Sequence, residues 1–173
     1  MAELYRSPYE AYPFLCDESG DLRCDFELLT DGLASGAGLL RAGVQDEALR
    51  AELLWVCELI YHMNPTLRTH LSVTRAECER LRAAVQRLQT EAGARCRRFV
   101  LPAGCAAACT AHMLRVQAKQ LVRLLYRHAR QGHAVEPLLF DLANLLSGYF
   151  FSLALWLNGQ AGVDETDFVS RNY

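Results

Sequence analysis

The chain has little proline and glycine, with 5 prolines and 11 glycines among its 173 residues. This scarcity excludes turn-rich β-sandwiches and low-complexity linkers, in which both residue types are frequent. An excess of positive charge is also absent, because 18 Lys and Arg residues stand against 20 Asp and Glu residues. A protein that binds nucleic acid through a broad cationic surface needs a stronger positive balance. We therefore expect no nucleic-acid partner.

Hydrophobic residues make up 51% of the chain, enough for a folded core, and the length suits one domain. The seven cysteines are an odd number, and no secretory leader follows Met1. These features disfavour a disulfide framework and favour a reducing, cytoplasmic location. Only Cys105 and Cys109 lie close together, without a second pair at metal-ligand spacing, so we expect no metal site.

The uncharged stretch Leu142–Val163 is long enough to raise the question of a membrane span. Several polar side chains interrupt it, and no cluster of Lys or Arg flanks it to set an orientation. We expect a buried helix of a bundle and no membrane partner.

The spacing of apolar residues predicts five helices joined by short connections. Their expected ranges are 25–41, 45–63, 74–92, 106–131 and 137–157. The third helix should begin with a capping box, because Thr74 and Glu77 stand three residues apart. We infer an all-α fold, an antiparallel five-helix bundle. The bundle is expected to span residues 24–158, between an N-terminal arm (1–23) and a C-terminal tail (159–173).

The sequence contains neither of the phosphate-loop patterns GxxxxGK[ST] and GxGxxG, and neither HExxH nor GxSxG. Candidate chemistry lies instead on the expected fourth helix, where Arg115, Lys119 and Arg123 recur every four residues along one ridge. The ridge is either a solvated face or a cationic wall for a polyphosphate, whose oxygens Arg can bind bidentately. Asp31 of the first helix could pair with one of these cations.

Two other polar residues stand out. His112 shares a helix with Arg115 and is either a structural histidine or a ligand-binding one. Asn144 interrupts the most apolar helix, and a buried amide requires hydrogen-bond partners. Its partner is either a neighbouring helix or a bound molecule.

Four segments, in order and in register, resemble motifs of the PduO-type ATP:cob(I)alamin adenosyltransferases, which are five-helix bundles. The segment T-D-G-L-A-S-G-A-G at 30–38 is similar to the family's V-D-E-L-N-S-x-I-G. T-R-A-E-C-E-R-L at 74–81 is similar to T-x-E-x-V-x-x-L. F-V-L-P-A-G at 99–104 and N-L-L-S-G-Y-F-F at 144–151 resemble F-I-L-P-x-G and N-R-L-S-D-x-L-F.

The resemblance implies roles for individual residues. Phe99 matches the aromatic residue that helps to displace the lower ligand of the corrinoid, which leaves cobalt four-coordinate. Arg115 matches an arginine of the ATP site, and Asp31 matches an aspartate that forms a salt bridge at a subunit boundary. We expect these three residues to act in catalysis. Further contacts to the substrates are expected from four residues: Lys119, Asn144, Arg123 and His112.

The resemblance also implies the substrates and the partners. Mg²⁺-ATP is the expected donor, and Co(I) of a reduced corrinoid is expected to attack the ribose C5′. A homotrimer with sites between subunits is expected, together with a reductase or a corrinoid-dependent enzyme as a protein partner.

The sequence also departs from the family pattern. The family has an N-terminal T-R-x-G-D-x-G loop that wraps the triphosphate. In this sequence only E-S-G-D at 18–21 is weakly similar to it. The R-R-A-E run is K-Q-L-V at 119–122, and Gly148 replaces the motif aspartate. Two hypotheses follow. The chain is either a divergent adenosyltransferase that holds ATP with other groups, such as the tyrosine-rich arm, or a paralogue that binds a corrinoid as carrier, sensor or scaffold without transfer.

Overall fold

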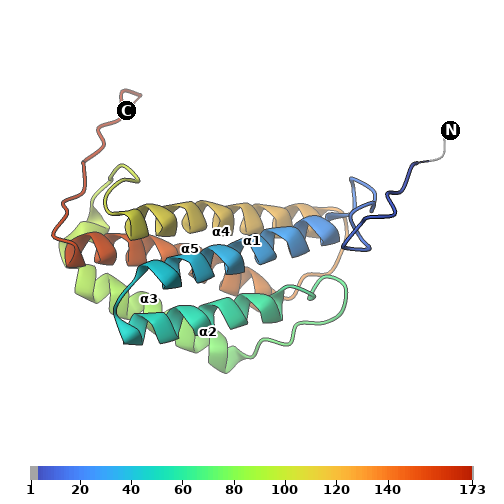
Figure 1. Cartoon of the computed structure of the whole chain (residues 1–173), viewed down its shortest axis with the longest axis horizontal. Helices are drawn as coiled ribbons and strands as arrows, with labels where there is room; N and C mark the ends of the chain where they lie inside the picture. The colour runs from blue at the N-terminus through green and yellow to red at the C-terminus, as the bar shows by residue number, and fades with distance from the viewer. Residues whose placement is uncertain (1–3, 173) are drawn as a thin grey trace.

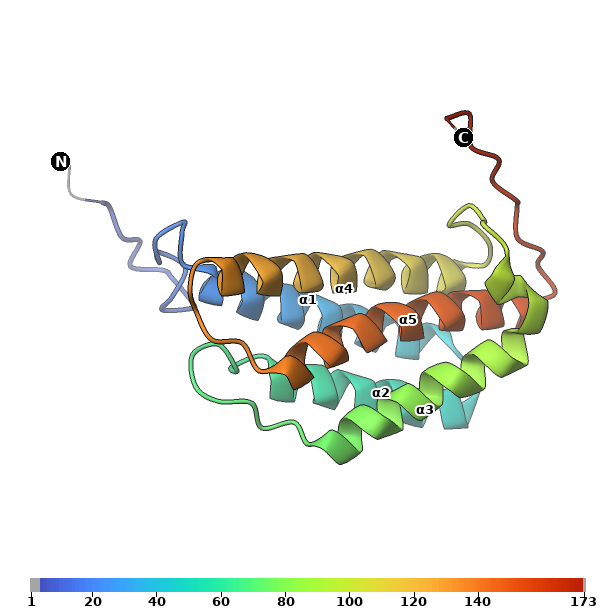
Figure 2. The same ribbon diagram turned by 180° about the vertical axis from the view of Figure 1, so that it is seen from behind.

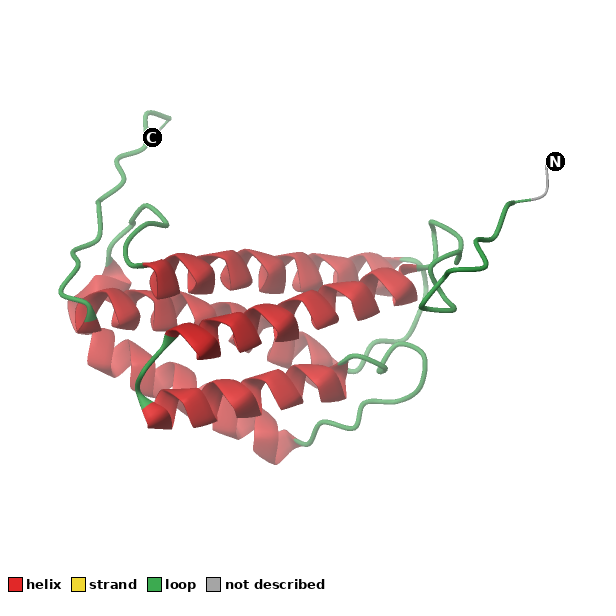
Figure 3. Cartoon of the chain, in the orientation of Figure 1, coloured by secondary structure: helices red, strands yellow, loops and turns green. Residues whose placement is uncertain are grey.

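The computed structural model describes residues 4–172, which form five α-helices and one 3₁₀ helix (Figure 1). The helices are α1 (Leu22–Gly43), α2 (Glu47–Met63), α3 (Arg75–Ala92), the 3₁₀ helix η1 (Gly93–Arg97), α4 (Ala106–Arg130) and α5 (Pro137–Gln160). Within the described residues no strand is formed, and Val100 and Asp167 make an isolated β-bridge (Figure 3). The predicted all-α bundle is confirmed, and the predicted helix ends differ from the observed ones by up to three residues.

The helices begin and end where the local chemistry predicts. Thr74 and Glu77 form the expected capping box, in which each side chain accepts a hydrogen bond from the other residue's backbone N–H. At the end of α3, Gly93 has a φ of 58°, a left-handed conformation that glycine adopts without steric cost. Pro137 occupies the first turn of α5, where its missing N–H costs no hydrogen bond.

The helices pack in the spatial order α2, α1, α4, α5, α3, so that α5 lies between α4 and α3 (Figures 1 and 2). By length and composition α5 could cross a membrane. In the bundle, however, its large side chains Tyr149 and Phe150 are fully buried and pack into the common core. The expected buried helix is confirmed.

A polar contact joins α2 to the other side of the bundle. Arg87 of α3 donates to both carboxylate oxygens of Glu52 at 2.9 Å, and the buried Tyr149 hydroxyl donates to the same carboxylate at 2.9 Å. Burial, reinforced by the charge of Glu52, raises the pKa of Tyr149 well above its ordinary value, so the hydroxyl stays a donor. The buried hydroxyl of Tyr149 thus has a hydrogen-bond partner.

The two terminal segments lie at opposite ends of the bundle (Figure 1). On the arm, Asp17 accepts a 2.6 Å hydrogen bond from Arg68, whose guanidinium also lies 3.6 Å from the centre of the Phe14 ring. On the tail, the buried carboxylate of Glu165 accepts a 2.7 Å hydrogen bond from Arg95. The tail therefore packs beside the α3–α4 connection, and the arm packs near the start of α1.

Candidate active site

A cavity of about 280 Å³ opens between the α3–α4 connection, α4 and α5. Its lining includes Phe99 from the connection, Arg115 and Lys119 from α4, and Gly148 and Phe151 from α5. Residues four apart on a helix share a face, which is why one turn of α4 contributes both cations. The structure thus brings together Phe99, Arg115 and Lys119, three residues that the sequence singled out.

Phe99 projects its aromatic ring into solvent, with 73% of the residue exposed. The extended segment that carries it is held by the C-terminal tail. The N–H of Phe168 donates to the carbonyl of Phe99 at 2.9 Å, and the N–H of Leu101 donates to the carbonyl of Thr166 at 2.9 Å. The rings of Phe99 and Phe168 meet edge-on with centroids 5.3 Å apart. An exposed ring on a fixed backbone is suited to contact a flat apolar ligand.

Gly104 allows this connection to turn into α4. Its φ is 135°, and a Cβ atom there would lie 2.0 Å from Oδ1 of Asn158. The Asn158 amide uses this space, because it accepts from the N–H of Cys105 at 3.0 Å and donates to the carbonyl of Ala103 at 3.1 Å. The glycine of the F-V-L-P-A-G segment is therefore required by close packing.

Arg115 has its guanidinium 5.8 Å from the centre of the Phe151 ring. Its Nε is buried and has no hydrogen-bond partner, and the guanidinium forms no ion pair within the described residues. A buried donor without a partner costs free energy unless a ligand satisfies it. The guanidinium of Arg115 therefore lies beside the Phe151 ring, and its N–H groups are free to bind an anion.

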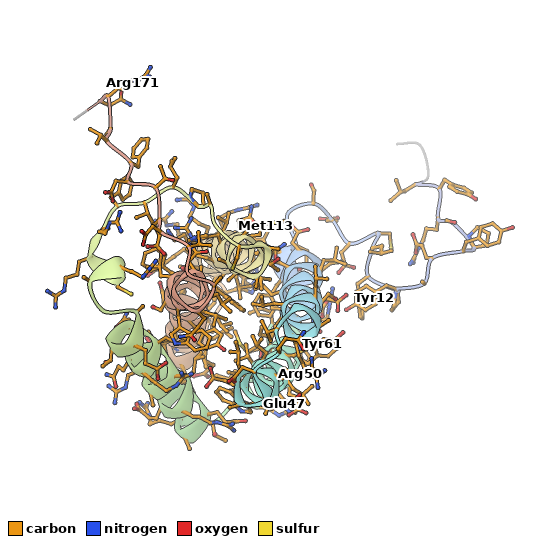
Figure 4. All side chains as sticks on the ribbon, turned by 60° about the vertical axis from the view of Figure 1, so that its left-hand side comes forward. Tyr12, Glu47, Arg50, Tyr61, Met113 and Arg171 are labelled. Carbon is orange, nitrogen blue, oxygen red and sulfur yellow. The ribbon has the colours of Figure 1, made fainter. Side chains whose placement is uncertain are left out.

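His112 is 4% exposed, and neither of its ring nitrogens has a hydrogen-bond partner. Its ring centroid lies 6.4 Å from that of Phe151. Burial, and secondarily the charge of Arg115, lowers the pKa of His112, so the imidazole is neutral at neutral pH. It borders a neighbouring groove of about 580 Å³ on α4, which also includes Arg115 and the exposed Met113 (Figure 4).

Asp31 does not reach the cations of α4 within the chain. Its carboxylate accepts a 2.7 Å hydrogen bond from the hydroxyl of Tyr61 on α2, so the side chain faces away from α4. Asp31 and Tyr61 line a pocket of about 270 Å³ together with Tyr12 and Glu27, and Figure 4 shows both tyrosines beside α1. Burial, together with Glu27, raises the pKa of Tyr12 to about 12. The pairing with a cation of the basic ridge that the sequence allowed for Asp31 is not formed within the chain, because α1 turns this face toward α2.

Asn144 is exposed, and its amide donates to the carbonyl of Phe140 at 2.9 Å on the same helix. Of the two partners considered for Asn144, the neighbouring helix is not observed, since the residue lies on the outer face of α5 and its amide bonds within that helix. Asn144 precedes the cavity residues Ser147 and Gly148 by one turn. It therefore lies along the ridge of α5 that leads to the cavity.

Arg123 lies outside the Phe99 cavity, in a shallow groove of about 680 Å³ between α1 and α4. Lys119, Arg127 and Asp25 also line this groove. Lys119 lines both the groove and the Phe99 cavity.

The E-S-G-D segment leads into the first turn of α1. The Asp21 carboxylate caps α1 by accepting from the N–H of Arg23 at 3.1 Å, and it also pairs with the Arg23 side chain. These bonds hold the pKa of Asp21 well below its usual range.

Three residues that line or support the candidate site were not predicted from the sequence. Arg127 lies one turn after the predicted Arg123, and Phe151 lies two turns after the predicted Asn144, so this spacing could have identified them. Phe168 lies in a polar tail 69 residues beyond Phe99, and no local pattern signals their contact.

The fold has solved relatives. Three structures of variants of a PduO-type ATP:corrinoid adenosyltransferase from Lactobacillus reuteri are similar to the chain. A phenylalanine-to-alanine variant complexed with cobalamin and ATP is 18% identical, with a TM-score of 0.77 and 87% of each chain covered. A phenylalanine-to-histidine variant with the same ligands is 20% identical, with a TM-score of 0.74, covering 88% of this chain and 85% of that one. An arginine-to-lysine variant complexed with ATP is 20% identical, with a TM-score of 0.76, covering 86% and 88%.

No curated protein sequence gives a significant match. The sequence profile of the family described as cobalamin adenosyltransferase matches residues 21–157, most of the chain. The match includes the five helices almost completely and the segment that carries Phe99. The chain therefore belongs to the cobalamin adenosyltransferase family.

Proposed function

We propose that this chain transfers the 5′-deoxyadenosyl group of ATP to the cobalt of a reduced corrinoid. The observation that carries the proposal is the cavity lined by Phe99, Arg115 and Lys119, in which an exposed aromatic residue lies with two cations that have no ion-pair partner among residues 4–172. An apolar ring suits the flat corrin, and the cations suit a polyphosphate.

In the proposed reaction, Phe99 covers one face of the corrin and keeps the lower ligand from cobalt. The lone pair of Co(I) then attacks C5′ of the ribose from the opposite face. A Co–C bond forms, the C5′–O bond breaks, and triphosphate leaves with the bonding electron pair while cobalt is formally oxidised to Co(III). Arg115 and Lys119 stabilise the charge that develops on the leaving oxygen, and the cavity holds the reacting atoms close together.

The lysine at position 119 is compatible with ATP binding. In the Lactobacillus reuteri enzyme, the substituted phenylalanine and the substituted arginine are twenty positions apart, as are Phe99 and Lys119 here. The arginine-to-lysine variant of that enzyme was solved in complex with ATP. Lysine keeps the positive charge of arginine and loses the planar fork.

ATP would bring Mg²⁺ with it. Among residues 4–172, no group of three or more His, Cys, Asp and Glu side chains is arranged to hold a metal ion. A Mg²⁺ ion that accompanies ATP would keep phosphate oxygens and water as its main ligands, which is its usual arrangement.

We further propose that the active unit is a homotrimer and that Asp31 acts across a subunit boundary. Within the chain Asp31 contacts Tyr61, and α1 and α4 expose large apolar residues that a neighbouring copy would cover. These exposed residues are Leu28, Leu39, Met113 and Val116.

Asn144 and His112 are proposed as further substrate contacts at the rim of the site. A reductase must supply Co(I), and the seven free thiols suit a reducing cytoplasm.

The alternative function is corrinoid binding without transfer. The absence of the N-terminal phosphate loop and the replacement of the motif aspartate by Gly148 favour it. The two functions differ in whether a Co–C bond is formed.

Anaerobic incubation with chemically reduced cobalamin and Mg²⁺-ATP tests the proposal through the visible spectrum. Protein-dependent conversion to light-sensitive adenosylcobalamin is the expected result. Conversion should be lost in Arg115→Ala and retained in Arg97→Ala, which removes an exposed arginine outside the cavity. A shifted corrinoid spectrum without conversion would support the binding protein instead, and an unchanged spectrum would contradict both.

A further inference from the structure

Helix α4 carries an uncompensated positive charge. It contains five cations and no Asp or Glu: Arg115, Lys119, Arg123, Arg127 and Arg130. Within the part of the chain that the structure describes, none of these five forms an ion pair, whereas eight arginines on other segments do. The whole chain has a formal net charge of −2, so this helix departs locally from the overall balance. A surface of this kind favours an anionic ligand.

The ridge of cations connects the two spaces described above. Every fourth residue of an α-helix advances by about 6 Å along the axis and about 40° around it. The ridge therefore winds from the α5 side of α4, where Arg115 and Lys119 border the Phe99 cavity, to the α1 side. There Arg123 and Arg127 line the groove opposite Asp25. Between Arg115 and Arg127 the ridge is about 18 Å long, enough for an extended triphosphate.

The chemistry of the transfer fixes the direction in which ATP lies along this ridge. The carbon that cobalt attacks must lie across the corrin from Phe99, and the α-phosphate is joined to that carbon through one oxygen. The β- and γ-phosphates must then extend away from Phe99. Lys119 lines both spaces, and the next two cations of the ridge, Arg123 and Arg127, line the groove.

We propose that Arg127, together with Arg123, binds the terminal phosphates of ATP in the groove between α1 and α4. This assignment rests on the proposed function and deepens it, because it supplies phosphate contacts to a chain without the N-terminal phosphate loop. Arg127 is a binding residue, and its guanidinium can contact two phosphate oxygens at once. Asp25, on the opposite wall of the groove, opposes the binding of an anion.

Calorimetric titration of the full-length protein with ATP, ADP and AMP tests the assignment. Arg127→Gln should weaken ATP binding about tenfold, the usual scale for one lost charge-assisted contact, and should leave AMP binding unchanged. Arg130→Gln is the matched control, because it removes the same charge from the same helix outside the groove lining. It should leave the affinities for all three nucleotides within about twofold of the wild type. Asp25→Asn should have the opposite effect and tighten ATP binding relative to AMP.

The outcomes separate this inference from the proposed function. If the wild-type protein binds no ATP, both fail. If it binds ATP and Arg127→Gln keeps the wild-type ratio of ATP to AMP affinity, the assignment of Arg127 is wrong and the proposed function stands. An equal loss of ATP and AMP binding in Arg127→Gln would also overturn the assignment, because AMP lacks the terminal phosphates. Should Arg127→Gln fail to fold, Asp25→Asn decides, and an unchanged ratio in that variant overturns the inference.

Discussion

The backbone N–H of Phe168 donates a 2.9 Å hydrogen bond to the carbonyl of Phe99, and the two rings pack edge-on. This contact joins the C-terminal tail to the residue at the mouth of the candidate active site. The tail lies beyond residue 157, where the family match ends, so the support of Phe99 comes from a part of the chain that the family profile does not include. Arg98 strengthens the junction through a 2.8 Å ion pair with Asp167.

Replacing Phe99 by alanine should separate corrinoid chemistry from nucleotide binding. We expect Phe99→Ala to lower kcat with reduced cobalamin by at least about tenfold, because the lower ligand is no longer kept from cobalt, with ATP affinity unchanged. The free energy of unfolding should fall by only about 1 kcal/mol, since the residue is 73% exposed and loses mainly its edge-on contact with Phe168. Steady-state kinetics, ATP titration and urea unfolding measure the three quantities. Equal losses of turnover and ATP binding would contradict the assigned role.

Phe168 should act on the reaction through Phe99. An edge-on aromatic pair contributes about 1 kcal/mol, so Phe168→Ala should raise the KM for the corrinoid several-fold while ATP affinity is kept. The matched control is Val169→Ala, which truncates the next residue of the tail, 85% of which is exposed. Phe168→Tyr should restore the wild-type KM. A KM that responds equally to the changes at positions 168 and 169 would show that the aromatic pair has no specific role.

The sequence predicts the bundle well because helix formation depends on local signals. The capping box at Thr74, the glycine at 93 and the apolar spacing along each helix are short-range features, and the structure has each of them as expected. The joint contribution of Arg115 and Lys119 to the Phe99 cavity also follows from a short spacing, because they are one turn apart on α4.

Long-range orientation could not be predicted in the same way. Asp31 contacts Tyr61, 30 residues away, because α1 turns that face toward α2, and periodicity does not tell which neighbour a polar residue meets. Asn144 lies in the most apolar helix and is nevertheless exposed, since α5 has one edge outside the core. The tail contact of Phe168 depends on how the last helix ends, which no sequence pattern fixes.

Glu165 should anchor the tail. Its buried carboxylate accepts a 2.7 Å hydrogen bond from Arg95, and Glu165→Gln should lower the free energy of unfolding by about 2 kcal/mol, because a buried ion pair loses one charge. Asp164→Asn is the control. Its carboxylate is 90% exposed and pairs with the same arginine at 3.2 Å, so the expected change is below about 0.5 kcal/mol. Urea unfolding measures both variants. A Glu165→Gln protein as stable as Asp164→Asn would show that the tail is held by its backbone contacts alone.

Two buried histidines should make stability fall as the pH drops below about 6.5, the ordinary pKa of histidine. Burial lowers the pKa of His112, with a further contribution from Arg115, and burial lowers the pKa of His128, with a further contribution from the stacked His133. Glu165 near His112 and Asp21 near His128 oppose these shifts without cancelling them. Between the ordinary and the lowered pKa the unfolded chain binds more protons than the folded chain, so protonation favours unfolding. The stabilisation is thus complete above the ordinary pKa and is lost as the pH falls toward the lowered values.

Urea unfolding at about pH 7.5 and about pH 5.5 should show a smaller free energy of unfolding at the lower pH. His133→Gln removes the stacked neighbour and should reduce the dependence, and a wild-type protein with equal stability at both pH values would contradict the lowered pKa values.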